Sequence, residues 1–199
     1  MEKFAIKKFN YLKHTFLILL ISIIATTLIG QTKYSTNYTK VSVEGSSTLH
    51  NWTMISDKSK CNASFNFNGN NIVSLTFLEF TVPVESLKSE NKGLDKNAYK
   101  ALKSSTYPEI NFTSSNAKIS KSADAFSITL NGKLTISGVT KDVIVMALAK
   151  FNSNDKTIST TGSFKIKMSE YKVQRPSVMF GTIKASDEVV VKFNIKLAK

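Results

Sequence analysis

The sequence has few of the residues that build covalent or metal-bound frameworks: one cysteine, two histidines, three prolines and eight glycines in 199 residues. The single cysteine, Cys61, excludes a disulfide within the chain and any metal site that needs several thiolates. His14 and His50 are too few for a histidine-rich metal centre. Because 42% of the residues are hydrophobic, we expect a globular chain rather than a disordered one.

Arginine is almost absent, although the chain carries a formal net charge of +13. Arg175 is the only arginine, and lysine supplies the remaining positive charge. Arginine makes most bidentate contacts to bases and phosphates, so we predict no nucleic-acid partner. Lysines on outward strand faces prevent edge pairing and account for most of the charge. The excess of positive charge is also compatible with peripheral contact between the protein and an anionic membrane surface.

Residues 1–30 have the pattern of a secretory signal peptide. Lysines precede an apolar run from Phe16 to Ile24, which is typical of export signals. We expect cleavage after Gly30 and a periplasmic or secreted protein. The alternative is a retained membrane anchor, although the run is short for a span of about 20 residues. Residues 31–199 are then predicted to form a single domain.

Apolar and polar residues alternate along most of residues 31–199, which predicts β-strands. The alternation is found in residues 41–43, 63–67, 73–77, 164–168 and 189–197. The segment Asn68–Asn71 predicts a turn. The parity of the apolar positions changes at Leu78, which predicts a bulge there or a strand buried on both faces.

The pair Asn131–Gly132 is typical of tight hairpin turns. A turn at this point would place Leu130 opposite Lys133, and Ile128 opposite Thr135. Directly opposed residues share a face, so apolar side chains would meet polar ones, and we reject this turn. In a continuous strand the glycine shares the inward face, where its missing side chain lets the strand coil or leaves room inside.

We therefore predict a long bent hairpin with its turn at Gly138–Lys141. This register pairs Ile136 with Val143, and Leu134 with Val145, so that apolar residues meet apolar ones. Such a hairpin is suited to closing a barrel. Leu94, Ala98, Ala101 and Leu102 have helical spacing instead, which predicts one short helix over 94–104 that could cap the mouth of that barrel.

We find no catalytic motif among those with a known mechanism. His50 lies near Ser46, Ser47 and Asp57 in sequence, which leaves open a dyad or triad, but one histidine without a motif more often serves a local structural role. Asp187 and Glu188 are adjacent and point to opposite faces of a strand, so they are unsuited to joint acid–base work.

Five segments, in order, resemble the YceI-like family of exported bacterial proteins. They are Gly45–Trp52, Val82–Ser89, Leu94–Leu102 with Pro108–Phe112, Gly132–Lys141, and Lys167–Tyr171 continuing through Pro176 to Met179–Gly181. The resemblance covers residues 40–197. Two positions depart from the family pattern, which commonly has Asp in place of Asn51 and a second proline in place of Arg175.

The resemblance implies an all-β, extended eight-stranded antiparallel lipocalin-like barrel with one short capping helix. It also implies non-catalytic binding of a polyisoprenoid or similar long-chain lipid, with no cofactor beyond such a lipid or a quinone as ligand, and it leaves a homodimer open. The cavity residues that we expect are Leu49, Trp52, Phe80, Leu94, Tyr99, Leu102, Phe112, Gly132, Met168, Tyr171 and Met179. The head-group candidates are His50, Lys88, Lys141 and Arg175.

Three other interpretations stay open at this point. The barrel could be a structural or interaction module whose interior is filled by side chains, because filled and hollow barrels share the same alternation. It could be embedded in a membrane, although Lys192 and Lys196 opposite the apolar face argue against a lipid-facing band. It could also be an enzyme that uses His50.

Overall fold

The computed structural model describes residues 31–199, except for the side chains of Val178 and Met179. No helix of this part is both long and apolar enough to span a membrane. In chain order its elements are β1 (Gln31–Ser46), β2 (Asn51–Ser56), β3 (Lys60–Asn68), β4 (Asn71–Pro83), the 3₁₀ turn η1 (Val84–Ser86), α2 (Lys92–Leu102), β5 (Glu109–Ser122), β6 (Ala125–Ile136), β7 (Val139–Asn152), β8 (Thr157–Lys167), η2 (Met168–Tyr171), β9 (Ser177–Val178), η3 (Met179–Gly181), β10 (Ile183–Lys184) and β11 (Glu188–Ala198).

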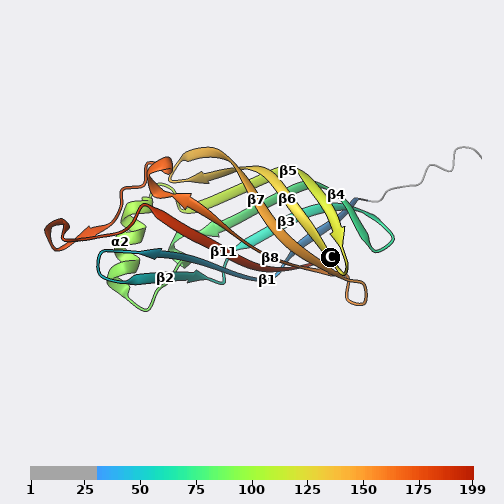
Figure 1. Ribbon diagram of the computed structural model, residues 1–199, viewed down its shortest axis with the longest axis horizontal. Helices are drawn as coiled ribbons and strands as arrows, with labels where there is room; N and C mark the ends of the chain where they lie inside the picture. Colours follow the sequence, from blue (N-terminus) through green and yellow to red (C-terminus); the bar gives the residue numbers. More distant parts are fainter. Residues whose placement is uncertain (1–30) are drawn as a thin grey trace, which may run out of the picture. The chain divides into compact units, whose positions relative to one another are not determined.

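The long strands close into an antiparallel barrel (Figure 1). Strands β3 to β8 pair in sequence order, β8 pairs with β11, and β11 pairs with β1 to close the ring. β3 and β2 share the other side of β1, where they pair with Gln31–Ser35 and Val41–Ser46 respectively. These two strands therefore take one position in the ring. Within the described residues the barrel has eight positions, which confirms the predicted fold.

The strand pattern predicted from alternation is confirmed. β3 and β4 are joined by a turn that begins after Asn68, and β6 continues through Asn131–Gly132 without a turn. The apolar residues of β6 are all buried on the inner face: Phe126, Ile128, Leu130, Leu134 and Ile136. A bulge in β4 skips Thr76, two residues before the expected position. Bulges of this kind increase the local twist, which helps a sheet to close.

The predicted register of β6 against β7 is wrong by four residues. Ile136 pairs with Val139 rather than Val143, and the turn consists of Ser137 and Gly138 alone. Both turn residues have positive φ, 49° and 78°, as a two-residue type I′ turn requires. A shift of four residues keeps the same side chains inward, but it places the exposed Lys141 opposite Leu134. The rule that apolar residues face apolar ones therefore selected the wrong register.

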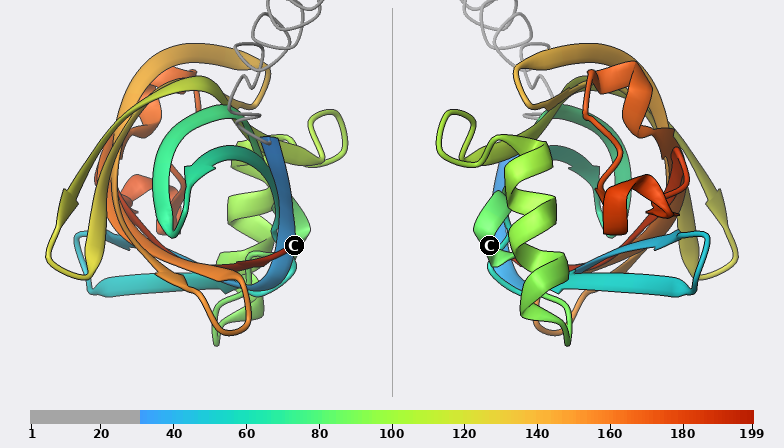
Figure 2. Two further views of the ribbon diagram at one scale, coloured as in Figure 1. Left: turned by 90° about the vertical axis from the view of Figure 1, so that its right-hand side faces the viewer. Right: turned by 90° about the vertical axis from the view of Figure 1, so that its left-hand side faces the viewer.

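Helix α2 begins two residues before the predicted range 94–104, because Asn91 caps it. The Asn91 side-chain oxygen accepts hydrogen bonds from the backbone N–H of Gly93 at 2.8 Å and of Leu94 at 3.2 Å. The helix ends at Leu102, two residues before the predicted end, because the next residue, Lys103, adopts the left-handed conformation with φ 55°. In the right-hand view of Figure 2 the helix lies across one end of the barrel, as the sequence predicted.

The two ends of the barrel are closed in different ways. At one end α2 packs over the space between β2 and β4, with Leu94, Ala98 and Tyr99 placed on a core cluster that contains Val41, Met54, Val82 and Leu87. At the other end aromatic rings contact one another with centroids 5.0 to 6.4 Å apart; they belong to Tyr34, Phe65, Phe67 and Phe151. These rings belong to the parts of β1, β3 and β7 that lie at the end of the barrel remote from α2 (Figure 1).

Candidate functional site

A cavity of about 490 Å³ lies inside the barrel. It extends from Phe65 in the aromatic cluster to the end covered by α2, and every barrel strand contributes to its wall. Its deep part is lined by Cys61, Leu75, Phe112, Ile128, Leu130, Val145, Ala147, Thr160, Ile195 and Leu197. A volume of this size is in the range of sites that hold small organic ligands, about 300 to 1,000 Å³.

Among the residues that the structure describes, no aspartate, glutamate, lysine or arginine lines the cavity. Thr160 is the one deep residue with a hydroxyl group. The other hydrogen-bonding side chains of the wall lie toward the α2 end: Ser47, His50, Trp52, Asn91, Asn97, Tyr171 and Ser177. The cavity is therefore suited to a ligand with a long apolar body and a polar group at one end.

Cys61 is the only thiol of the chain, and it lies in the wall of the cavity. It is buried, and burial raises the pKa of the Cys61 thiol to about 12. The thiol is therefore uncharged at neutral pH, where a neutral sulfur behaves as a small apolar group. This position adds no charge to the deep wall.

The mouth of the cavity is formed by three segments: the turn Ser47–His50, the start of α2, and residues 176–185. Trp52 lies just inside it, and its indole N–H donates to the backbone oxygen of Ser46 at 3.1 Å. The Trp52 ring also lies so close to Gly45 that a side chain there would collide with it. Backbone contacts thus fix the one tryptophan of the chain at the mouth.

Hydrogen bonds hold α2 in place over the mouth. The Tyr99 hydroxyl donates to the backbone oxygen of Leu87 at 2.6 Å, and Ser137 Oγ donates to that of Leu102 at 2.9 Å. The Lys88 ammonium lies 4.9 Å from the centre of the Tyr99 ring. These contacts join the C-terminal half of the helix to the barrel rim.

The family model for the YceI-like domain matches residues 27–197. The chain belongs to this family. No curated protein matches the sequence. The fold of the chain is similar to that of BcnA from Burkholderia cenocepacia. The TM-score is 0.62, the sequences are 22% identical, and the match covers 79% of this chain and 95% of that chain.

Two further solved structures share the YceI-like fold. One is described as a polyisoprenoid binding domain from Saccharophagus degradans implicated in plant cell wall breakdown, with TM-score 0.62, 13% identity, and coverage of 83% of this chain and 97% of that chain. The other is the YceI protein of Campylobacter jejuni, with TM-score 0.52, 21% identity, and coverage of 70% and 81%. At these identities the likeness concerns the fold.

The YceI-like barrel brings together most of the residues that the sequence nominated. The predicted residues that line the cavity are Leu49, Trp52, Phe80, Leu94, Leu102, Phe112, Met168, Tyr171 and, among the head-group candidates, His50. The side chain of Met179 lies outside the described residues. These residues line the cavity, and their contact with a ligand stays a prediction.

Gly132 lies on the inner face of β6, as expected, but it leaves no space for a ligand. A Cβ atom there would lie 2.5 Å from the ring of Phe112 and 2.5 Å from the backbone oxygen of Thr113. The Phe112 ring fills the room that the glycine provides, and it is Phe112 that lines the cavity. The expected role of Gly132 as a gap in the cavity wall is therefore wrong.

Four other nominated residues lie outside the cavity wall. Tyr99 faces the rim, where its hydroxyl bonds to the backbone of Leu87. Lys88 and Arg175 are exposed near the mouth, and Lys141 is exposed on β7. These lysines and the arginine could meet only a group that protrudes from the mouth.

His50 does not form a catalytic pair in the described residues. Ser47 bonds only to its backbone: Ser47 Oγ donates to the His50 carbonyl at 3.0 Å and accepts from the His50 N–H at 3.2 Å. Asp187 accepts from the hydroxyl of Ser169, and hydrogen bonds from Ser169 hold the pKa of Asp187 below its ordinary value. Glu188 pairs instead with Lys165, so the adjacent carboxylates serve separate contacts.

Sequence reasoning missed the deep wall contributed by β7, β8 and β11. Val145, Ala147, Thr160 and Ile195 line the cavity but were not nominated. The alternation had already placed β7 and β11 residues on an inner face. It could not say which inner residues border empty space, because that depends on how far apart opposite strands lie.

Proposed function

We propose that the protein binds a polyisoprenoid or similar long-chain amphiphilic lipid in its cavity, and that it carries or stores this lipid unchanged in the bacterial cell envelope. The observation that carries the proposal is the distribution of polarity along the cavity. The deep wall is uncharged and, apart from Thr160, apolar. Aromatic rings pack against one another at the far end, and polar side chains gather at the mouth. Each methylene group buried there would contribute about 0.8 kcal/mol.

Two further points support a lipid ligand. The chain belongs to the YceI-like family, and one structure of the same fold is described as a polyisoprenoid binding domain. The export pattern of residues 1–30 supports the envelope as the location. A barrel filled by side chains, the alternative from the sequence, would not have a cavity of about 490 Å³.

The direct test is mass spectrometry of an organic extract of protein purified without detergent, with native mass spectrometry for the stoichiometry. We expect one prenyl or other long-chain species in stoichiometric amount. If the extract is empty, the protein is offered isoprenoid quinones. Failure to take up any of them would exclude the lipid function.

A matched pair of variants locates the binding in the cavity. Ala147 lines the cavity, and Met146, its neighbour on β7, is 67% exposed on the outer face. Ala147→Phe should abolish lipid uptake, because the ring fills the cavity, whereas Met146→Phe should leave uptake unchanged. Circular dichroism checks the fold, and Ala147→Leu serves as a smaller replacement. Unchanged uptake in a folded Ala147 variant would place the lipid elsewhere.

A further inference from the structure

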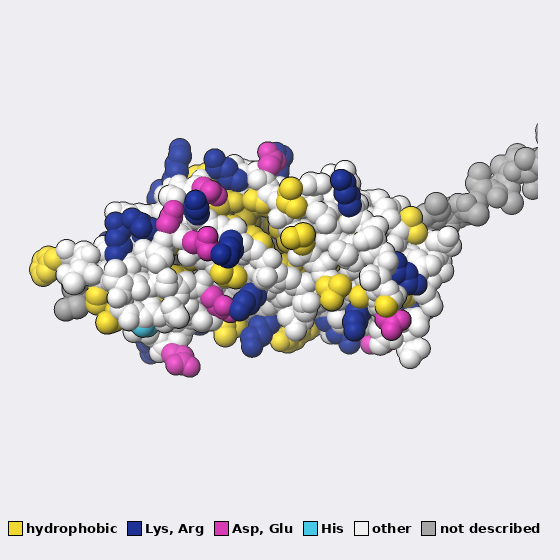
Figure 3. All heavy atoms as spheres, viewed as in Figure 1, with side chains coloured by type: hydrophobic (Ala, Val, Ile, Leu, Met, Phe, Trp, Pro, Cys, Tyr) yellow, Lys and Arg dark blue, Asp and Glu magenta, His cyan; other side chains and the backbone are white. Residues whose placement is uncertain are grey.

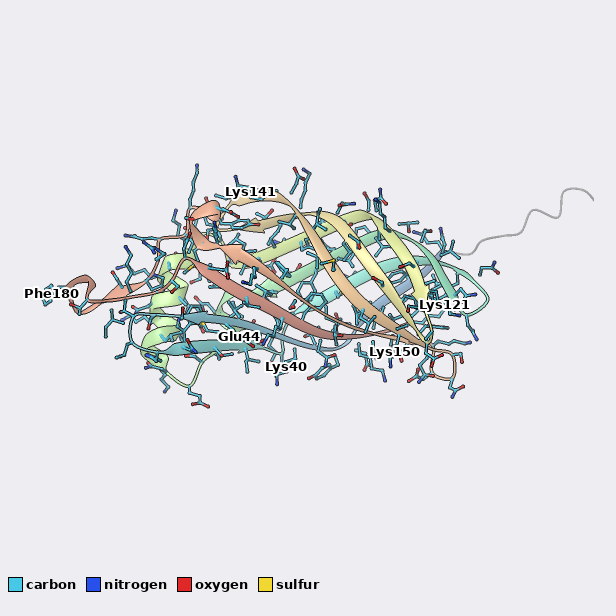
Figure 4. All side chains as sticks on the ribbon, viewed as in Figure 1. Lys40, Glu44, Lys121, Lys141, Lys150 and Phe180 are labelled. Atoms are coloured by element: carbon cyan, nitrogen blue, oxygen red, sulfur yellow. The ribbon has the colours of Figure 1, made fainter. Side chains whose placement is uncertain are left out.

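Two exposed apolar side chains stand at the rim of the cavity mouth. Leu49 is 68% exposed at the turn between β1 and β2, and Phe180 is fully exposed at the end of the β9–β10 hairpin. Figure 4 places Phe180 at the extreme left of the molecule, and Figure 3 shows hydrophobic atoms at the same extremity. We name the segments Ser47–His50 and Ser177–Lys184 together the mouth tip.

Hydrogen bonds join the two segments of the mouth tip into one unit. The Thr48 backbone N–H donates to the Lys184 carbonyl at 3.2 Å, and the Thr48 hydroxyl donates to the Thr182 carbonyl at 3.1 Å. Behind them, the Ser186 N–H donates to the Ser46 carbonyl at 2.8 Å. Leu49 and Phe180 are therefore carried by one hydrogen-bonded structure, although they lie far apart in sequence.

The backbone of Phe180 is strained. Its φ is 56°, in the left-handed region that an aromatic residue seldom adopts, and Gly181 follows with φ 91°. The ring gains no packing in return, because it is fully exposed. A strained backbone that presents an unpacked aromatic ring is a feature found at functional surfaces.

The two segments that form the mouth tip, with their immediate neighbours in sequence, carry charge of one sign. Residues 45–51 and 171–185 contain no aspartate or glutamate, and they contain Lys172, Arg175 and Lys184. These three side chains are exposed, and none takes part in the five ion pairs of the described residues. Exposed basic side chains beside exposed apolar ones are the combination that binds anionic lipid surfaces.

We propose that the mouth tip docks the protein on an anionic lipid bilayer, with Leu49 and Phe180 inserted among the lipids and the basic side chains facing the head groups. Docking in this orientation directs the mouth of the cavity toward the membrane. Docking would let a lipid pass from the bilayer into the cavity without crossing water. This consequence rests on the proposed function, in which the cavity holds a lipid.

A second exposed apolar surface supplies the control. Ile144, Met146 and Leu148 stand on the outer face of β7, and Met146 is as exposed as Leu49, at 67%. Their cross-strand neighbours on β6 are neutral: Asn131, Thr129 and Ser127. This surface has basic neighbours as well, since Lys118 pairs with Thr129 and Lys150 lies two residues beyond Leu148 on the same face of β7. Met146 therefore tests whether an exposed apolar side chain near lysines is enough for binding without the mouth tip.

The test measures co-sedimentation of the protein with vesicles of phosphatidylcholine alone and of phosphatidylcholine with phosphatidylglycerol. We expect binding to the anionic vesicles, weakened by salt. Leu49→Ser and Phe180→Ser should each weaken it about tenfold or more, because each removes a large buried apolar side chain from the bilayer. Met146→Ser should leave it unchanged.

A second pair of variants tests the charge. Replacement of Lys172, Arg175 and Lys184 by glutamine should remove the preference for anionic vesicles. The same replacement of Lys118, Lys121 and Lys150, which are all exposed, should retain it. Figure 4 places Lys121 and Lys150 at the end of the barrel opposite Phe180, and Lys118 lies three residues before Lys121 on β5. If both triple variants lose vesicle binding to the same extent, net charge alone attracts the vesicles, and the proposal is overturned.

Lipid loading, measured on the same samples, separates the two proposals. If vesicle binding is absent or unaffected by Phe180→Ser, while isoprenoid quinone dispersed in detergent still loads, docking is wrong and the proposed function stands. If vesicles bind through the mouth tip but no source of lipid ever loads the cavity, the proposed function fails and docking stands. Slower loading from vesicles but normal loading from detergent in Phe180→Ser supports both.

Discussion

The ring of Phe112 occupies the space that a side chain at Gly132 would need, and its other face borders the cavity. The glycine on β6 and the phenylalanine on β5 are thus packed as a pair. β5 is irregular at this point, because its register against β6 shifts between Thr113 and Asn116. A change at either residue would therefore alter both the pairing of β5 with β6 and the wall of the cavity.

We predict that Gly132→Ala lowers the free energy of unfolding by about 1–3 kcal/mol, a typical cost of overpacking a core. The new methyl group would press on the Phe112 ring and on the Thr113 carbonyl. Urea denaturation measures the change. Gly93→Ala is the control, because a Cβ atom there would have one close neighbour, the Asn91 side-chain oxygen at 3.1 Å, which has to move by only a few tenths of an ångström.

The double variant Gly132→Ala with Phe112→Leu tests the cause. Leucine frees part of the space, so the two changes should cost less together than the sum of each alone. The rigid Thr113 carbonyl prevents full recovery. Strict additivity would show that Phe112 is not the obstacle.

Trp52 should report ligand binding. It is the only tryptophan, and it lines the cavity just inside the mouth. A lipid chain that replaces water beside the ring should shift the fluorescence emission to shorter wavelength, with saturation at the stoichiometry found by native mass spectrometry. The cavity-filling Ala147→Phe variant should give no shift on addition of the same lipid. An equal shift in that variant would assign the signal to lipid outside the cavity.

The stability of the barrel should fall above pH 9. Burial raises the pKa of Cys61 to about 12, whereas the exposed thiol of the unfolded chain has a pKa near its ordinary value of 9.0. Between these values the unfolded chain releases the proton and the folded protein keeps it. The free energy of unfolding therefore decreases as pH rises, by up to about 1.4 kcal/mol per pH unit. Burial also raises the pKa of Tyr34 and Tyr171, which acts in the same direction at higher pH.

Urea denaturation between pH 8 and 10, a range that lies about one unit either side of the free thiol's pKa, measures this slope. Cys61→Ala should be less stable at every pH, because it loses buried volume, but its stability should decline less steeply above pH 9. Parallel curves for the two proteins would assign the decline to other groups.

The sequence by itself determined which residues form strands and which of their faces point inward. This follows from backbone geometry, since side chains alternate across a strand whatever it pairs with. The inner face of β6, from Phe126 to Ile136, was read correctly for this reason. The capping helix was also evident locally, from the spacing of Leu94, Ala98 and Ala101, although its start depended on the cap at Asn91.

Only the tertiary structure decided what depends on distance between strands. Two registers of β6 against β7 kept the same faces inward, and the positive φ angles of Ser137 and Gly138 selected one. Gly132 was correctly placed on the inner face, but Phe112 from another strand filled its space. The cavity exists because the barrel is too wide for its inner side chains to meet, and the mouth tip exists because hydrogen bonds join Thr48 to Lys184. Neither relationship is local, so no pattern in the sequence could reveal them.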